Sequence, residues 1–116
     1  MGINMLFTGR VQKGTKRAVA LGFPTINIPL DDADVSGIYA ARVQAGEKVY
    51  EAAAYADQKR GVLEAHLLDF AKDLYGWKVT IKLLKKIRED KKFSDDAGLR
   101  IAIADDVAKV REYFKN

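Results

Sequence analysis

The sequence contains no cysteine and only one histidine among its 116 residues. Without cysteine the chain can form neither a disulfide framework nor a thiolate metal site, and it has no cysteine nucleophile. A single histidine is too few for a histidine-rich zinc site. These absences exclude disulfide-stabilised domains, the common zinc proteins and cysteine-dependent enzymes.

Long apolar runs are also missing. No uninterrupted apolar stretch approaches the roughly 18 residues of a membrane-spanning helix. The N-terminal residues do not follow the charged-then-apolar pattern of a secretory signal. We therefore expect a cytoplasmic protein that has no membrane partner.

The length and the 48% hydrophobic content predict one small domain, residues 1–116, with a core of its own. We expect it to be a monomer. Its net charge of +4 suits an anionic ligand and would permit nucleic-acid binding. However, the five tyrosines and five phenylalanines are scattered, and no strand interleaves aromatic with basic residues as a base-stacking surface does. A small basic nucleic-acid-binding barrel is therefore the least favoured hypothesis, and no nucleic-acid partner is expected.

Hydrophobic periodicity predicts short strands followed by a single helix. Period-two alternation occurs in residues 3–11, 38–43, 48–55, 62–70 and 77–86. Residues 44–47, which include Gly46, are typical of a hairpin turn. From Leu99 to Phe114 apolar residues recur at helical spacing, and Ser94 is the predicted N-cap of this amphipathic helix of about five turns.

The stretch from Leu21 to Ile28 is the most distinctive in the chain. Pro24 fixes its own φ and favours an extended residue before it. Thr25 and Asn27, two residues apart in an extended segment, share a face. They present two neutral oxygen donors beside a glycine-containing loop, which is what a magnesium–nucleotide site requires. Taken alone, the stretch is more often a polar turn that leads into a strand.

The loop before it is basic, with Lys13, Lys16 and Arg17. It superficially resembles a P-loop, in which a lysine comes directly before a serine or threonine and a helix follows. Here the order is reversed, because Thr15 precedes Lys16, and no helix is predicted to follow. A phosphate-binding loop and an ordinary solvated loop both remain open.

Glu64 and His66 are neighbours on the largely apolar second face of their predicted strand. An ionisable side chain in such a place needs a partner or a function. For Glu64, pairing with a cation and a functional role are equally favoured. For His66 a structural role is the commoner case.

In combination, these motifs resemble the riboflavin kinase (flavokinase) family, which includes the C-terminal module of bifunctional FAD synthetases. The resemblance covers nearly the whole chain and is carried mainly by Gly22-Phe-Pro-Thr-Ile-Asn27, Glu64-Ala-His66, Leu74-Tyr-Gly76 and Lys92-Phe93. It implies an all-β-dominated fold, a closed six-stranded antiparallel Greek-key barrel with a C-terminal helix outside.

The resemblance also implies a reaction, the transfer of the ATP γ-phosphate to the riboflavin 5′-hydroxyl, giving FMN and ADP with Mg²⁺ as cofactor. Glu64 would accept the hydroxyl proton, Thr25 and Asn27 would ligate Mg²⁺, and Arg88 and Phe93 would bind flavin. His66 receives no role. The nucleotide phosphates would be held by Gly14, Lys16, Arg17, Gly22, Pro24 and Thr25. A non-catalytic flavin- or nucleotide-binding paralogue is the alternative.

Two departures from the family pattern weaken the implied nucleotide site. Ala18-Val19 stands where the family usually has Gly-Arg. The family also carries Asn-Ile-Gly and a longer loop between the middle strands, whereas Tyr55-Ala-Asp57 leads almost directly to Glu64. We therefore expect ATP to bind less well than flavin. No adenylyltransferase domain is recognisable, so FAD synthesis is not expected of this chain.

Overall fold

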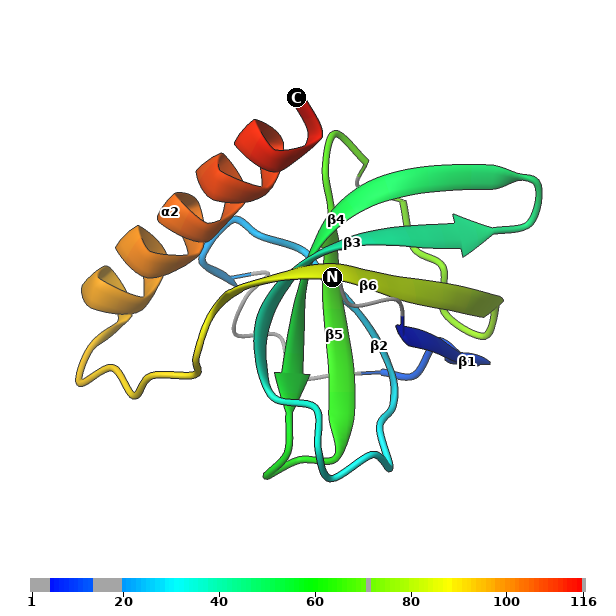
Figure 1. Cartoon of the computed structure of the whole chain (residues 1–116), viewed down its shortest axis with the longest axis horizontal. Coiled ribbons are helices and arrows are strands. Elements are labelled where there is room, and N and C mark those ends of the chain that lie inside the picture. The colour runs from blue at the N-terminus through cyan, green and yellow to red at the C-terminus, as the bar shows by residue number, and fades with distance from the viewer. Residues whose placement is uncertain (1–4, 14–19, 71, 116) are drawn as a thin grey trace.

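The computed structural model describes residues 5–13, 20–70 and 72–115. Within these ranges it contains six strands followed by one long helix (Figure 1). The elements are β1 (Met5–Arg10), β2 (Ile26–Pro29), β3 (Gly37–Ala45), β4 (Lys48–Asp57), β5 (Val62–Leu67), β6 (Lys78–Arg88) and α2 (Asp96–Lys115). The predicted strand-then-helix order is confirmed.

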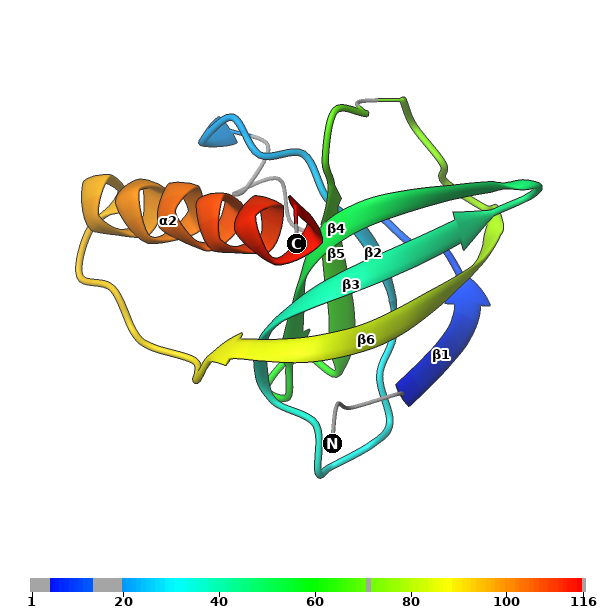
Figure 2. The ribbon, with the colours of Figure 1, turned by 45° about the horizontal axis from the view of Figure 1, so that its top comes forward.

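All strand pairs are antiparallel, in the order β1-β6-β3-β4-β5-β2. The last strand, β6, therefore lies between β1 and β3 (Figure 2). The two edge strands of the sheet are β1 and β2. They approach each other just after β1, where the Gln12 backbone N–H donates to the Asn27 carbonyl over 2.7 Å. The expected six-stranded antiparallel barrel is thus confirmed, although it is nearly rather than fully closed.

Several element boundaries differ from the prediction. Residues 26–29 form a strand, β2, that the alternation pattern did not reveal. The hairpin turn is shorter than predicted because β3 continues to Ala45, and Gly46 adopts a φ of 64° in the two-residue turn. The strand predicted to reach residue 70 ends at Leu67, because Asp69 has a φ of 60°, which a strand does not accommodate.

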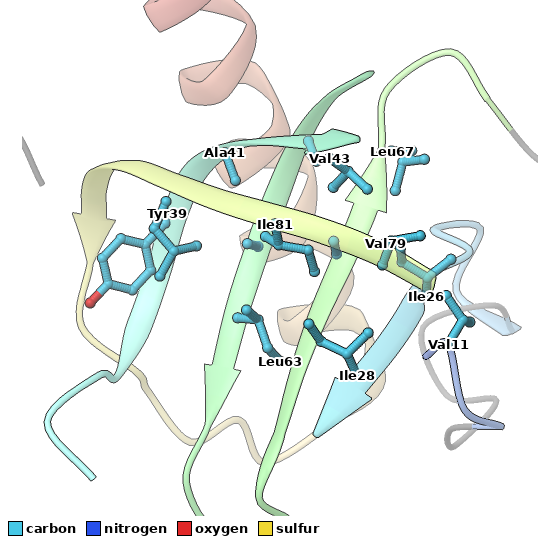
Figure 3. Close-up of a cluster of buried hydrophobic side chains, with 14 of the residues drawn as sticks. Val11, Ile26, Ile28, Tyr39, Ala41, Val43, Leu63, Leu67, Val79 and Ile81 are labelled. Carbon is cyan, nitrogen blue, oxygen red and sulfur yellow. The ribbon is translucent and has the colours of Figure 1, made fainter. Parts of the chain in front are cut away.

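The barrel interior is packed with aliphatic side chains, which Figure 3 shows between the strands. Ile28, Leu63 and Ile81 are fully buried. The buried core residues that β4 contributes are the small Ala52, Ala54 and Ala56, and the partly buried Tyr50 packs against the same cluster. Successive residues of a strand point to opposite faces, so the residues between these alanines face outward. That outer face carries the candidate site.

Helix α2 packs against the outside of the barrel through its C-terminal half. Val110 is fully buried beside Ala40 and Leu68, and Val107 and Phe114 pack against this second cluster. In the described part of the chain no helix has both the length and the apolar character to cross a membrane.

The helix begins one residue later than predicted. Asp95, rather than Ser94, is the N-cap, because its carboxylate accepts the Gly98 N–H over 2.8 Å and its carbonyl accepts the Leu99 N–H.

Candidate functional site

A cavity of about 600 Å³ lies between α2 and the outer face of β4 and β5. Its volume falls within the range typical of small-molecule sites, about 300–1,000 Å³. Its walls come from three parts of the fold. The barrel supplies Thr25, Ala53, Tyr55, Asp57, Glu64 and His66; the end of β6 and the segment after it supply Arg88, Asp90, Lys91, Lys92 and Phe93; and α2 supplies Leu99, Ile103 and Asp106.

Glu64 lies at the centre of a row of outward-facing side chains. It pairs with Asn27 of β2 on one side and with Tyr55 of β4 on the other. Directly paired residues in antiparallel strands present their side chains to the same face. Ile26 and Ile28 point into the core, so Asn27 points outward with Glu64. Glu64 is only 9% exposed although it lines the cavity.

Arg60 bridges two carboxylates at this site. Its Nη2 lies 2.8 Å from Glu64 Oε1, and its Nε lies 2.7 Å from Asp57 Oδ2. Desolvation by itself would lower the pKa of Arg60, but the hydrogen bonds to Asp57 and Glu64 outweigh it and raise this pKa. Glu64 therefore pairs with a cation, which is one of the two roles that the sequence left open, and it also faces the cavity.

Asn27 carries a buried polar atom without a partner. The side chain is 3% exposed, and Oδ1 has no hydrogen-bond partner among the described residues. A buried carbonyl oxygen in this state costs about 1–3 kcal/mol. A hard divalent cation would satisfy it. Thr25, two residues away, lines the cavity, and Asn27 lies beside Glu64, which also lines it. No group of three or more histidine, cysteine, aspartate or glutamate ligands occurs in the described ranges.

His66 holds the segment that carries Thr25. Its Nδ1 lies 2.8 Å from the Pro24 carbonyl oxygen, and its ring meets Phe23 edge-on, with 5.6 Å between centroids. Because a carbonyl can only accept, Nδ1 carries the proton in this contact. Gly22, just upstream, has a φ of 92°, which favours glycine there. These contacts support the structural role that the sequence favoured for His66.

Arg88 joins the end of β6 to α2. Its Nε and Nη2 donate to the two carboxylate oxygens of Asp106 over 2.7 and 2.8 Å. The hydrogen bond to Asp106 raises the pKa of Arg88, with burial opposing it. The guanidinium also lies 5.8 Å from the centre of the Phe93 ring, within the range of a cation–π contact. This bidentate pair fixes the wall of the cavity that α2 contributes.

Tyr55 connects the parts of the cavity wall that come from β4 and from the segment after β6. Its hydroxyl donates to Asp90 Oδ2 over 2.9 Å and so connects β4 to the segment after β6. Burial raises the pKa of Tyr55 well above its usual range, and the hydrogen bond to Asp90 and nearby carboxylates raise it further.

Comparison with known proteins connects this geometry to a family. The family model described as "Flavokinase: Riboflavin kinase" matches residues 1–114. The chain belongs to the riboflavin kinase family. The bifunctional riboflavin kinase/FMN adenylyltransferase of Escherichia coli strain K12 is 37% identical over 123 residues, covering 98% of this chain and 39% of that protein. The chain thus spans about two fifths of the length of this curated relative.

Solved structures also match this riboflavin kinase fold. The riboflavin kinase of Trypanosoma brucei superposes with a TM-score of 0.73 at 25% identity, covering all of this chain and 79% of that one. A structure from Streptococcus pneumoniae, described as a macrolide-efflux protein, superposes with a TM-score of 0.80 at 27% identity, covering 93% of this chain and 38% of that one. Both structures therefore contain a domain with the fold of this chain.

The structure brings together most of the site residues that the riboflavin kinase resemblance indicated. Thr25, Glu64, Arg88 and Phe93 line one cavity, and Asn27 lies beside Glu64. Gly22 and Pro24 precede Thr25 and shape its segment without lining the cavity. Gly14, Lys16 and Arg17 lie outside the described residues, as does the Ala18-Val19 departure.

Sequence reasoning missed Tyr55, Asp57, Arg60 and Asp106 as members of this site. A signal existed for Asp106, because this carboxylate falls within the apolar helical stripe between Ile103 and Val110. The predicted strand over residues 48–55 contained Tyr55, whereas β4 continues to Asp57, which shares the face of Tyr55. Nothing in the sequence pattern placed Arg60 against Glu64, because that contact depends on the path of the turn.

Proposed function

We propose that the chain is an ATP:riboflavin 5′-phosphotransferase that produces FMN and ADP. The observation that carries the proposal is Glu64, a buried carboxylate that faces a cavity of ligand size beside the unpartnered oxygen of Asn27. Family membership supports the same reaction. We further propose that residues 1–116 form a single riboflavin kinase-like domain that acts as a monomer in the cytoplasm.

In the proposed reaction the riboflavin 5′-oxygen attacks the γ-phosphorus, and the bond from that phosphorus to the β,γ-bridging oxygen breaks. Glu64 orients the hydroxyl and accepts its proton. Phosphoryl transfer depends mostly on positioning and charge neutralisation, so one carboxylate aimed at an alcohol is enough for the proton step.

Asn27 Oδ1 and the Thr25 hydroxyl are the atoms that would hold Mg²⁺, because both are hard oxygen donors at the Glu64 side of the cavity. When bound, Mg²⁺ neutralises charge on the ATP phosphates. Gly22 and Pro24 shape the backbone next to those phosphates. Gly14, Lys16 and Arg17, from the loop before them, complete the proposed phosphate-binding set.

The apolar part of the cavity suits a flat, mostly uncharged ring system. Phe93 comes from the segment after β6, and Leu99 and Ile103 from the N-terminal half of α2. Arg88, fixed by Asp106, places a cation and its N–H donors at the same wall. We propose that Arg88 and Phe93 contact the flavin, so that its ribityl chain extends toward Glu64.

Incubation of the purified chain with riboflavin, ATP and MgCl₂, followed by chromatography, tests this proposal. We expect FMN to form, and only when all three are present. Riboflavin binding without FMN formation would favour a non-catalytic flavin-binding paralogue. Failure to bind either substrate would refute the proposed function.

A further inference from the structure

Arg60 occupies an unusual position between two buried carboxylates. Asp57 is 8% and Glu64 is 9% exposed, and the Arg60 guanidinium contacts both, at 2.7 and 2.8 Å. All three residues line the cavity. The contact is therefore part of the site where the transfer is proposed to occur.

The short connection between β4 and β5 builds this arrangement. Asp57 ends β4, and its Oδ1 accepts the backbone N–H of Arg60 over 3.2 Å. Gly61 follows with a φ of 64°, a conformation that favours glycine and leads the chain into β5. Asp57 thus holds both the backbone and the side chain of Arg60.

Two carboxylates buried at one site repel each other. A Glu64 carboxylate that turned away from the cavity could not reach an alcohol bound there. The guanidinium between the two carboxylates compensates their charge, and its planar fork restricts the direction of each contact.

We propose that Arg60 is a positioning residue for phosphoryl transfer: anchored by Asp57, it keeps the Glu64 carboxylate directed into the cavity. This inference rests on the proposed function and deepens it. The short β4–β5 turn thereby supplies the cation that holds the proton acceptor. Arg60 acts through Glu64 and needs no contact of its own with the substrate.

Kinetic double-mutant cycles test the inference. We expect Arg60→Gln to lower kcat by about tenfold or more, within the coupling energies of contacting residues. Arg60→Lys, which keeps the charge, should recover part of that loss. In a Glu64→Gln background, measured under single-turnover conditions, Arg60→Gln should change the rate by less than about twofold, because the group it positions no longer accepts a proton.

A second cycle uses Asp57→Asn, which removes the charge that anchors Arg60. It should lower kcat when Arg60 is present and have little further effect in the Arg60→Gln background. Arg111→Gln is the matched control, because Arg111 also pairs with an aspartate, Asp69, but on the surface outside the cavity. Thermal unfolding and riboflavin binding of each variant would identify losses caused by misfolding.

The outcomes separate the two claims. If the unaltered chain forms no FMN, the proposed function fails and the inference fails with it. If the unaltered chain is active, two results would overturn the positioning role alone. One is an Arg60→Gln loss of rate that is as large in the Glu64→Gln background as in the unaltered chain. The other is an Arg60→Lys variant that is as slow as Arg60→Gln.

Discussion

At the scale of single residues, Glu64 is the group on which the proposed chemistry depends. Glu64→Gln fills the same space and can still accept a hydrogen bond from Arg60, but it cannot take the hydroxyl proton. We expect kcat to fall by about 10²–10⁴-fold with riboflavin affinity retained. Steady-state kinetics and flavin fluorescence quenching measure the two effects. Glu47→Gln, at the exposed hairpin turn, is the control, and an active Glu64→Gln enzyme would remove Glu64 from the mechanism.

Thr25 and Asn27 test the cation site at the same scale. Thr25→Val and Asn27→Leu each delete one oxygen ligand and should weaken Mg–ADP binding, measured by calorimetry, while riboflavin binding persists. An equal fall in flavin and nucleotide affinity would contradict this assignment.

At the scale of elements, the Arg88–Asp106 pair connects β6 to α2. Asp106→Asn leaves a partly buried guanidinium without its countercharge, so we expect the free energy of unfolding to fall by about 1–3 kcal/mol. Riboflavin affinity should fall as well, since the same pair fixes the α2 wall of the cavity. Denaturant titration and fluorescence quenching measure these effects. If Asp106→Asn lowers the stability but leaves the flavin affinity unchanged, the prediction that α2 contributes to flavin binding is wrong.

The basic loop before Leu21 is the second element with a testable consequence. Restoring the family's pair through Ala18→Gly and Val19→Arg adds one flexible residue and one cation. Because a charge-assisted phosphate contact contributes about 1.5–3 kcal/mol, the KM for ATP should fall by about tenfold or more. The KM for riboflavin should change much less. Tight ATP binding by the unaltered chain would show that Ala18 and Val19, in place of the family's Gly-Arg pair, do not weaken ATP binding.

At the scale of the whole molecule, Tyr55 gives the stability of the barrel a pH dependence. Its pKa is raised in the folded state, so above about pH 10, the ordinary value for tyrosine, the unfolded chain loses a proton that the folded chain keeps. Stability conferred by the neutral hydroxyl is therefore present below that pH and is lost as the pH rises.

Tyr55→Phe should remove this contribution. Melting temperatures at pH 9, 10 and 11 are expected to fall less steeply for Tyr55→Phe than for the unaltered chain. Tyr75→Phe, which alters an exposed ring, should retain the original slope. Parallel slopes for all three proteins would show that the environment of Tyr55 does not govern the alkaline transition.

The sequence by itself determined the parts of this protein that depend on local pattern. Alternation located most strands and the spacing from Leu99 to Phe114 located the helix, because side-chain periodicity follows directly from backbone geometry. The family motifs predicted the barrel. They also indicated Thr25, Glu64, Arg88 and Phe93, which line the cavity between the barrel and α2. The extended conformation around Asn27 was expected, but the alternation pattern did not give the bounds of the short strand β2, because a segment of that length shows too little alternation.

Only the tertiary structure decided which distant residues meet. The Arg88–Asp106 pair spans 18 positions and the Tyr55–Asp90 hydrogen bond spans 35. The Arg60–Glu64 contact is close in sequence, yet it forms only because a turn anchored by Asp57 directs the guanidinium back over β5. Such contacts depend on strand register and chain direction, which arise when the whole barrel packs and leave no periodic signal in the sequence.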